Sequence, residues 1–534
     1  MNTLTGTGGL VRLILRRDRA LLPIWVLVVS LMPVGFVSAT EQLYPTAAER
    51  LSYARTSGTN PTFLALYGPL YDPGLGGIIA QRSGFLPVIV ALICAFTVVR
   101  HTRTEEEGGR RELLGATVLG RGAALAAALL VTALACLAVA VLLAAGMMSQ
   151  GLPAAGSLAF GLQFAATGVL FAAVAGIAAQ LTETAAAARG LSVAVLGAAF
   201  AVRLAADAGG AGNGLSWLGW LSPLGWTQRL RPYAEERWWT LALVAVVLLV
   251  LVWAAVRLAA SRDLGAGLLP SRPGPATASP GLTRPFGLAW RLQSRTLYGW
   301  LAGFAALGLI YGAVAGGMQD MVRDNPGLRD VFTRMGGASG ITDSYFASVM
   351  GILGLIASGY AVSAALKLRS EESALHAEAV LVAGVGRVRW AVGHLLFAVL
   401  GPAALLAVGG FAAGFVHGLD TGRVGAETLR VLGAAMAQLP AVWLIGALAV
   451  TLFGLVPRLA ATVWAAVAAA VGITMFGAVV GLDQWALNLS PFTHVPKLGG
   501  AAFTATPLVV LAAAAAVLLA VGVAGFRRRD LAFG

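Results

Sequence analysis

The sequence is poor in charged residues, lysine and cysteine, and each shortage excludes a class of protein or a kind of site. Only 11% of the 534 residues are charged while 58% are hydrophobic, which excludes an ordinary soluble domain and favours a membrane protein. Lysine occurs only as Lys367 and Lys497, neither of them in a GxxxxGKS/T pattern, so the chain lacks a P-loop for nucleotide. Cys94 and Cys136 lie in hydrophobic runs, where they offer neither a disulfide framework nor the ligand spacing of a metal site.

The net charge of +13 comes from arginines at the ends of hydrophobic runs. Cytoplasmic loops of membrane proteins are enriched in such residues. No long basic stripe with interleaved aromatic residues lies outside these runs, so we expect no nucleic-acid partner.

Twelve hydrophobic runs are long enough to cross about 30 Å of hydrocarbon. They lie near residues 20–39, 85–100, 122–147, 157–181, 190–206, 239–256, 298–316, 347–365, 389–415, 427–453, 461–481 and 506–525. The sequence therefore predicts an all-α integral membrane protein. A segment with five prolines between the two sets of six predicts a first half at 1–258, a cytoplasmic linker at 259–285 and a second half at 286–534.

The distribution of positive charge predicts the orientation of the spans. If the first residue is inside, the inner segments hold 24 of the 37 lysines and arginines. By the positive-inside rule, both termini are expected in the cytoplasm of a multi-pass protein of the bacterial cell membrane.

An acidic and basic loop occurs twice, once in each half. The stretch from Arg103 to Glu112, followed by Gly120-Arg121, aligns without a gap with the stretch from Arg369 to Glu378, followed by Gly386-Arg387, and six positions are identical. In helical form, the loop would pair Glu106 with Arg110, Glu107 with Arg111 and Glu372 with His376 at i, i+4. The alternative is a set of solvated charges at the end of a span, but an idle loop need not keep this register in both halves.

Other duplicated positions extend the repeat over the whole chain. Gly9, Leu10 and Arg17 match Gly287, Leu288 and Arg295, in basic amphipathic stretches that fit interfacial elbow helices or plain basic flanks. Trp217 and Leu-Ser-Pro223 match Trp485 and Leu-Ser-Pro491. With six spans in each half, the two repeats are parallel rather than inverted and suit a symmetric partner.

Polar residues within the spans are few. Arg203, with Asp207 one turn later, fits an ion pair in the outer leaflet or a group on the substrate path. We expect Gln163, Gln180, Gln438 and His394 to tie helices together. The Ser-Pro breaks at Pro223 and Pro491, with Trp217 and Trp485, mark a possible outer gate, with an aromatic belt as the alternative.

Together the duplicated RxEEExGRxELL-type loop, the elbow, the Leu-Ser-Pro and the six-plus-six layout resemble the permeases of ABC-2 exporters. The specific similarity is to the tetronasin-resistance or polyketide-antibiotic exporters and to mycobacterial multidrug efflux permeases. It covers essentially the whole chain. The second loop departs from the pattern, because Ser373, Ala374, Leu375 and His376 replace Glu107, Gly108, Gly109 and Arg110, so the two docking faces need not be equivalent.

The resemblance implies twelve spans as two parallel pseudo-repeats of six, of the type V or ABC-2 exporter kind. Two copies of a separate ABC ATP-binding subunit would dock on the inner loops, hold ATP and Mg, and drive export of a small amphipathic compound. The chain itself would bind no cofactor and would be no enzyme. Coupling contacts would be Arg103, Glu105, Glu106, Arg110, Glu112 and Arg121 in the first half and Arg369, Glu371, Glu372, His376, Glu378 and Arg387 in the second.

Two other functions remain open on sequence alone. A proton-coupled multidrug transporter would need a buried carboxylate relay, but the acidic residues lie almost entirely in loops. A membrane enzyme, such as a lipid-linked transferase, should show paired carboxylates or histidine clusters near an interface, and no such cluster is convincing. The sequence does not name the substrate.

Overall fold

In the computed structural model, the chain forms two compact units, Met1–Gly274 and Pro275–Gly534. The structure describes all residues except 1–2, 59–62, 65–66, 112–117, 208–213, 264, 270–275, 278, 324–336, 481, 497–503 and 531–534. Within the described residues, twelve helices are long and apolar enough to span a membrane, six in each unit. Each coincides with one of the twelve predicted runs, so the prediction of an all-α membrane protein is confirmed.

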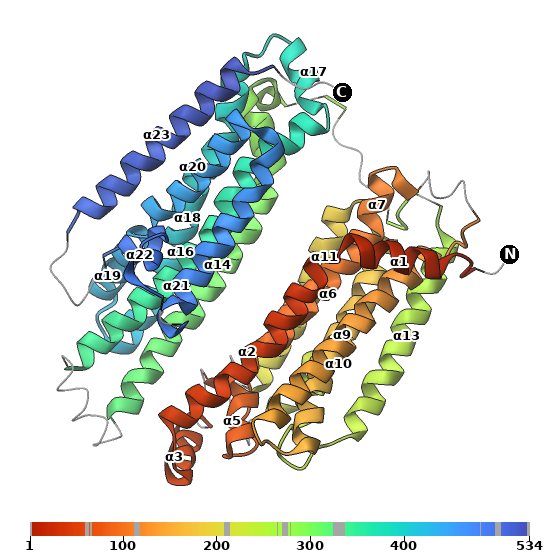
Figure 1. The fold of residues 1–534 in the computed structure, drawn as a ribbon, viewed down its shortest axis with the longest axis vertical. Coiled ribbons are helices and arrows are strands. Elements are labelled where there is room, and N and C mark those ends of the chain that lie inside the picture. The colour runs from red at the N-terminus through yellow and green to blue at the C-terminus, as the bar shows by residue number, and fades with distance from the viewer. Residues whose placement is uncertain are drawn as a thin grey trace. The chain divides into compact units, whose positions relative to one another are not determined.

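The first unit is a bundle of long helices that run side by side (Figure 1). Its elements are α1 (Thr7–Arg17), α2 (Leu21–Leu43), α3 (Ala47–Ser57), α5 (Leu75–Arg82), α6 (Leu86–His101), α7 (Arg103–Glu107), α9 (Ala123–Ser149), α10 (Ala154–Leu181), α11 (Ala185–Asp207), η1 (Ser216–Leu221), α12 (Pro223–Gln228) and α13 (Trp239–Ser261). α10 is central, since it packs on α6, α9, α11 and α13.

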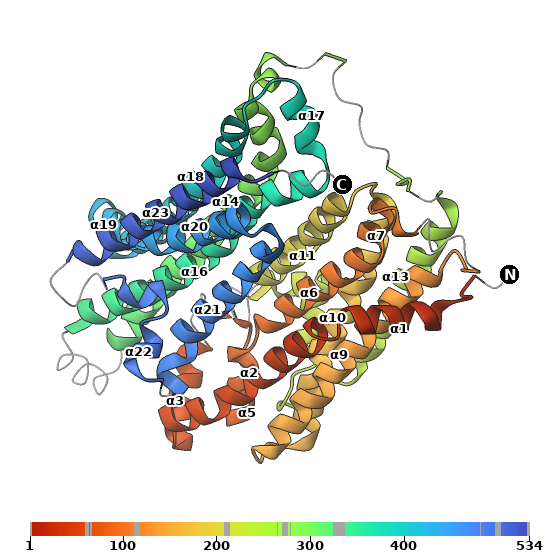
Figure 2. The same ribbon diagram turned by 45° about the horizontal axis from the view of Figure 1, so that its top comes forward.

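The second unit is also a bundle of long helices (Figure 2). Its elements are η2 (Pro280–Thr283), α14 (Pro285–Arg323), α16 (Gly337–Ser373), α17 (His376–Val382), α18 (Arg387–Thr421), α19 (Val424–Met436), α20 (Leu439–Leu455), η3 (Pro457–Thr462), α21 (Val463–Val480), α22 (Gln484–Leu487), η4 (Pro491–His494) and α23 (Thr506–Arg528). α18 packs on α14, α16 and α19, while α20 packs on α23.

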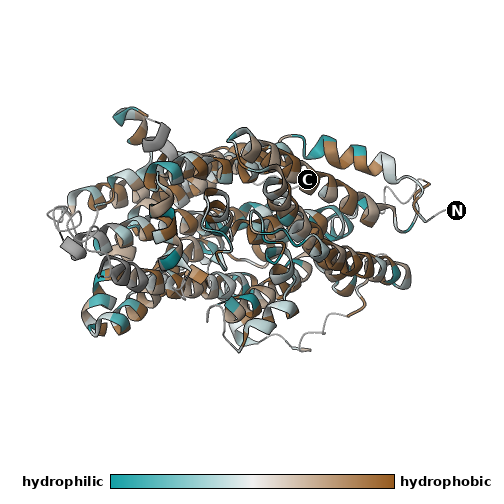
Figure 3. Ribbon diagram, turned by 90° about the horizontal axis from the view of Figure 1, so that it is seen from below, coloured by the Kyte–Doolittle hydropathy of each residue, from teal (hydrophilic) through white to brown (hydrophobic). Residues whose placement is uncertain are grey.

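Hydrophobic residues predominate along the long helices, with hydrophilic residues between them (Figure 3). Because lipid is as apolar as the bundle core, packing between spans depends on close approach at small residues. Gly308 and Gly312 of α14 lie against the backbone of Gly409 and Ala413 of α18, so an added Cβ at either glycine would overlap that backbone. Gly454 of α20 meets Gly522 of α23 in the same way.

The predicted elbows differ between the units. Thr7–Arg17 forms a separate amphipathic helix in the first unit, with Ile14 buried, and the chain turns at Asp18 before α2 begins. In the second unit, residues 286–297 are the first turns of the continuous helix α14. A separate second elbow is therefore wrong.

Candidate functional site

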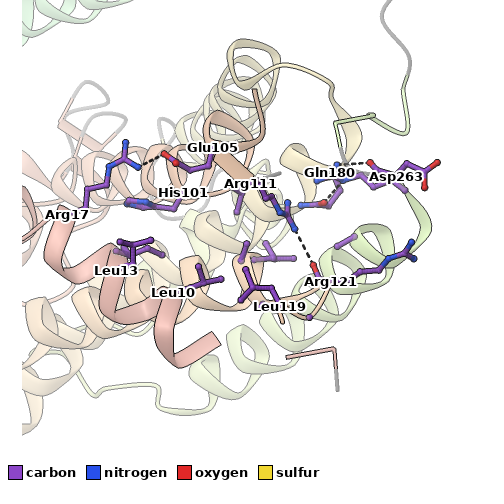
Figure 4. Close-up of a pocket in the computed structure, with 18 residues that line it drawn as sticks. Leu10, Leu13, Arg17, His101, Glu105, Arg111, Leu119, Arg121, Gln180 and Asp263 are labelled. Carbon is purple, nitrogen blue, oxygen red and sulfur yellow. Dashed lines mark hydrogen bonds and ion pairs between the residues drawn. The ribbon is translucent and has the colours of Figure 1, made fainter. Parts of the chain in front are cut away.

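The candidate docking loop of the first unit begins directly at the end of the second span. α7 extends this span to Glu107, where the helix ends at Gly108 and Gly109, the latter with φ of 67°. Such a left-handed conformation suits glycine. The loop lies beside α1 at one end of the bundle (Figure 4).

Glu106 is the centre of an ion-pair network. Its buried carboxylate accepts hydrogen bonds from Arg103 at 2.5 Å and from Arg262 at 2.8 and 3.0 Å, and it also pairs with Arg111. Burial and the neighbouring guanidinium groups of Arg262 and Arg103 lower the pKa of Arg111 to about 10. One carboxylate thus pairs with three arginines. Hydrogen bonds between ionised groups of this kind are stronger than those between neutral groups.

Arg103 ties the loop to the start of the predicted linker. Its side chain is fully buried and donates to the carbonyl of Thr182, after α10, and to that of Ala266 at 2.8 Å. The backbone amides of Leu268 and Leu269 donate to the carbonyls of Gln180 and Leu181. The linker's first part is therefore fixed on the first unit.

The other charges of this loop connect it to two helices, α1 and α11. Glu105 pairs with Arg17 of α1 and, at 3.5 Å, with Arg110. Glu107 accepts a hydrogen bond of 2.8 Å from the amide of Ala185, the first residue of α11, where a carboxylate also offsets the helix dipole.

The predicted i, i+4 pairs in this loop are wrong. Arg110 pairs with Glu105 rather than Glu106, and Arg111 pairs with Glu106 rather than Glu107. The physical reason is the glycine turn after Glu107, which ends the helix and moves the two arginines out of helical register.

Arg121 and Glu112 are the remaining predicted contacts of this loop. Arg121 is exposed, and its backbone carbonyl accepts a hydrogen bond from Arg111. Glu112 lies outside the described residues.

The second unit repeats the main contact of the first. Glu372, buried near the end of α16, accepts two hydrogen bonds from Arg529, at 2.8 and 2.5 Å. Arg529 directly follows the last span, as Arg262 does in the first unit, and its guanidinium stacks on Phe453 and Phe526. Each unit thus joins the end of its second span to the end of its sixth.

The remaining predicted residues of the second loop range from buried Glu371 to exposed Glu378. Glu371 pairs with Lys367 at 2.8 Å and with His376 at 3.2 Å, so the predicted pair of Glu372 with His376 is wrong. The reason is Leu375, whose φ of 60° breaks the helix between α16 and α17. Glu378 is exposed, Arg369 is half-buried, and Arg387 donates to the carbonyl of Arg529.

Sequence reasoning missed Arg262 and Arg529, although a signal was present. The loops align at an offset of 266 residues and the Leu-Ser-Pro motifs at 268, and the two arginines lie 267 apart, just after equivalent spans. Their position in the repeat, rather than any local motif, would have found them.

At the other end of each bundle, the duplicated serine before proline anchors a turn. Ser222 is buried and donates to the carbonyl of Ala199 in α11 at 2.6 Å, and Ser490 is buried 2.8 Å from the hydroxyl of Thr474 in α21. Pro223 then begins α12, and Pro491 begins η4. The predicted non-helical turn is confirmed at both positions.

The tryptophans near these turns face outward. Trp217 is 57% exposed and Trp485 is 69% exposed, which fits a membrane-interface position. Arg203 and Asp207 are buried with 3.8 Å between Nε and Oδ2, so the predicted pair is confirmed, and Arg203 also lies over the ring of Phe200. Roles in a gate or path stay predictions.

Two of the polar residues within the spans tie helices together as expected. Gln180 accepts a hydrogen bond of 2.6 Å from Arg262, and His394 lies 3.1 Å from Gln293 of α14.

Twelve apolar helices with charged contacts at their ends define a multi-pass helical membrane protein. The chain is 43% identical over 528 residues to the multidrug efflux system permease protein Rv1217c of Mycobacterium tuberculosis (strain ATCC 25618 / H37Rv), covering 99% of this chain and 95% of that protein. Residues 282–527 match the family model described as multidrug efflux system permease Rv1217c, C-terminal domain. The chain therefore belongs to the family of multidrug efflux permeases, which are membrane transporters.

Proposed function

We propose that this chain is the membrane subunit of an ATP-driven exporter that moves small amphipathic compounds out of the cell. Two separate ATP-binding subunits would hold ATP and Mg and dock on the loops after the second span of each half. The relative is the permease of a multidrug efflux system, and the word system supports the presence of a further component. The chain's own lack of a P-loop means that the energy of ATP would have to come from that component.

The observation that carries this proposal is the repeated ion pair of Glu106 with Arg262 and of Glu372 with Arg529. A force applied to either loop would reach the last span of the same unit through a buried charge pair. A loop that only capped a span would not need a buried ion pair to the last span, and this ion pair occurs in both units. We therefore assign Glu106 and Glu372 to transmission inside the unit rather than to direct contact with the partner.

The surface for the partner would lie on the exposed side of the loops. Arg110 has a side chain that is 55% exposed, and His376 one that is 69% exposed. In the second unit, Leu375 and Val382 are 46% and 82% exposed at the two ends of α17, with Glu378 between them. Exposed apolar residues beside charges are typical of an interaction surface.

Copurification and transport test the proposal together. Arg110→Glu and Glu378→Arg should weaken copurification with a co-expressed ATP-binding subunit and reduce drug resistance in proportion. Arg423→Glu, an exposed arginine between α18 and α19 at the opposite end of the second unit, is the matched control. Export that survives a hydrolysis-deficient partner but stops when the proton gradient is collapsed would favour the proton-coupled alternative.

The same proposal places both termini and the loops in the cytoplasm, as the arginine distribution favours. Reporter fusions test this: alkaline phosphatase joined after Arg529 should be inactive, and joined after Trp217 it should be active. The reverse pattern would overturn the orientation.

A further inference from the structure

A cavity of about 340 Å³ lies at the end of the first unit that carries α7 (Figure 4). Its walls come from α1, the end of α6, the start of α9 and the ends of α10 and α13. The volume falls in the range of about 300–1,000 Å³ that is typical of small-molecule sites. Arg17, Glu105, Arg111 and Arg262 of the ion pairs described above are among its lining residues.

One wall of the cavity is apolar. α1 contributes Leu10, Leu13 and Ile14, and Leu119 and Leu125 also line the space. Leu13 is 49% exposed although it belongs to the hydrophobic face of an amphipathic helix. Such helices lie in the plane of the membrane interface with their apolar face toward acyl chains.

The other wall is rich in positive charge. Among the described residues, this wall holds the arginines Arg17, Arg111, Arg121 and Arg262 and the carboxylates of Glu105 and Asp263. Behind the wall, Glu106 is shared by Arg111, Arg262 and Arg103.

Within the part of the chain that the structure describes, Arg121 has no ion-pair partner. An anion placed here would gain charge-assisted hydrogen bonds in a partly desolvated site.

The second unit has an open groove beside the start of its first span. It measures about 630 Å³ and is lined by Phe286, Trp290, Arg291 and Arg295 from the first turns of α14, with no acidic residue among its described lining residues. Arg295 is the repeat equivalent of Arg17. The combination of a basic wall and an apolar wall beside the first span therefore occurs in both halves.

We propose that the cavity of the first unit binds an anionic phospholipid of the bilayer, with its phosphate on Arg17, Arg121 and their neighbours and its acyl chains along Leu10 and Leu13. A headgroup alone would leave the apolar wall exposed to water, and a neutral lipid would leave Arg121 without a counterion. Basic pockets between the ends of membrane helices take anionic headgroups for the same reasons. The site thus belongs to the permease chain itself and does not depend on an ATP-binding subunit.

The test is a titration of the purified full-length chain in detergent with fluorescently labelled phosphatidylglycerol and phosphatidylcholine. The background variant R291Q/R295Q removes the arginines of the groove in the second unit. In that background, R17Q/R121Q should weaken phosphatidylglycerol binding by about fivefold for each arginine. Glu105→Gln should strengthen it, because it removes a negative charge from the wall, and an unfolded variant could not produce a gain.

The matched control is R12Q/R16Q, which removes two exposed arginines from the same helix that do not line the cavity. Equal affinity for the two lipids, or equal losses in R17Q/R121Q and R12Q/R16Q, would overturn the proposal. Displacement of the lipid by glycerol 3-phosphate at a similar concentration would overturn the role of the acyl chains and leave a simple phosphate site. Weak displacement is the expected result.

Discussion

Arg262 donates from a single guanidinium nitrogen to both carboxylate oxygens of Glu106, at 2.8 and 3.0 Å. Glu106 lies at the end of the second span and Arg262 directly after the sixth, 156 residues later. Arg529 and Glu372 repeat the relationship in the second unit. Among the described residues, Glu372 pairs with one arginine, whereas Glu106 pairs with three. The pair of Glu372 with Arg529 is therefore the simpler of the two to test.

The simple pair allows a double-mutant cycle. Glu372→Gln and Arg529→Gln should each lower the melting temperature of the purified chain, and the double variant should lose less than the sum. We expect a coupling free energy of about 1–3 kcal/mol, the upper part of the range for directly bonded residues. Glu378→Gln, an exposed neighbour, is the control. Additive losses would show that the pair contributes nothing beyond its separate residues.

Glu106→Gln should be more damaging than Glu372→Gln. It leaves Arg103, Arg111 and Arg262 close together without their shared carboxylate, and breaking a buried pair typically costs about 3–5 kcal/mol. Thermal unfolding followed by a fluorescent probe measures the difference. Glu41→Gln, an exposed glutamate near the end of α2, should leave the transition in place. An equal effect of the Glu106 and Glu41 variants would contradict the network.

A tight contact between Tyr233 and Gly156 predicts a specific overpacking effect. The ring of Tyr233 lies where a Cβ on Gly156 would be, so Gly156→Ala should cost about 1–3 kcal/mol. In a Tyr233→Ala background the same change should cost much less. Gly190→Ala in α11 is the control, because nothing lies within 4 Å of its added Cβ. A Gly156→Ala loss that persists without the tyrosine ring would refute this explanation.

The two cysteines predict a pattern of chemical labelling. Cys94 of α6 and Cys136 of α9 are fully buried with 3.4 Å between their sulfur atoms. A maleimide joined to polyethylene glycol should add to neither thiol in the native chain and to both after denaturation in sodium dodecyl sulfate. Val118→Cys, at a position that is 68% exposed, should label at once. Rapid native labelling of Cys94 or Cys136 would contradict the packing of α6 on α9.

The spans were predictable because hydrocarbon requires a long stretch of apolar sequence, and each of the twelve runs reaches or comes close to that length. The serine before Pro223 and the one before Pro491 were also found as breaks, since proline and its preceding residue leave a strong local pattern. Arg203 and Asp207 were paired correctly because both lie on one uninterrupted helix, where i, i+4 spacing determines proximity.

Pairings across breaks and between distant helices were not predictable in the same way. Gly109 and Leu375 have positive φ angles, which end the helices and change the partner of every charge that follows. Arg262 contacts Glu106 only because α13 packs on α10 and so ends beside α7. A single sequence gives no measure of such packing, although the spacing of the repeat relates Arg262 to Arg529.

The hydrogen bonds that hold Leu268 and Leu269 against the end of α10 also shorten the connection between the two units. The usable chain starts at Leu269 rather than at Ser261, where α13 ends. The eight residues from 262 to 269 are therefore not available to connect the two units. In extended form they would span about 27 Å. That length would return to the connection only if the amides of Leu268 and Leu269, and with them the contact of Arg103 with the carbonyl of Ala266, were released.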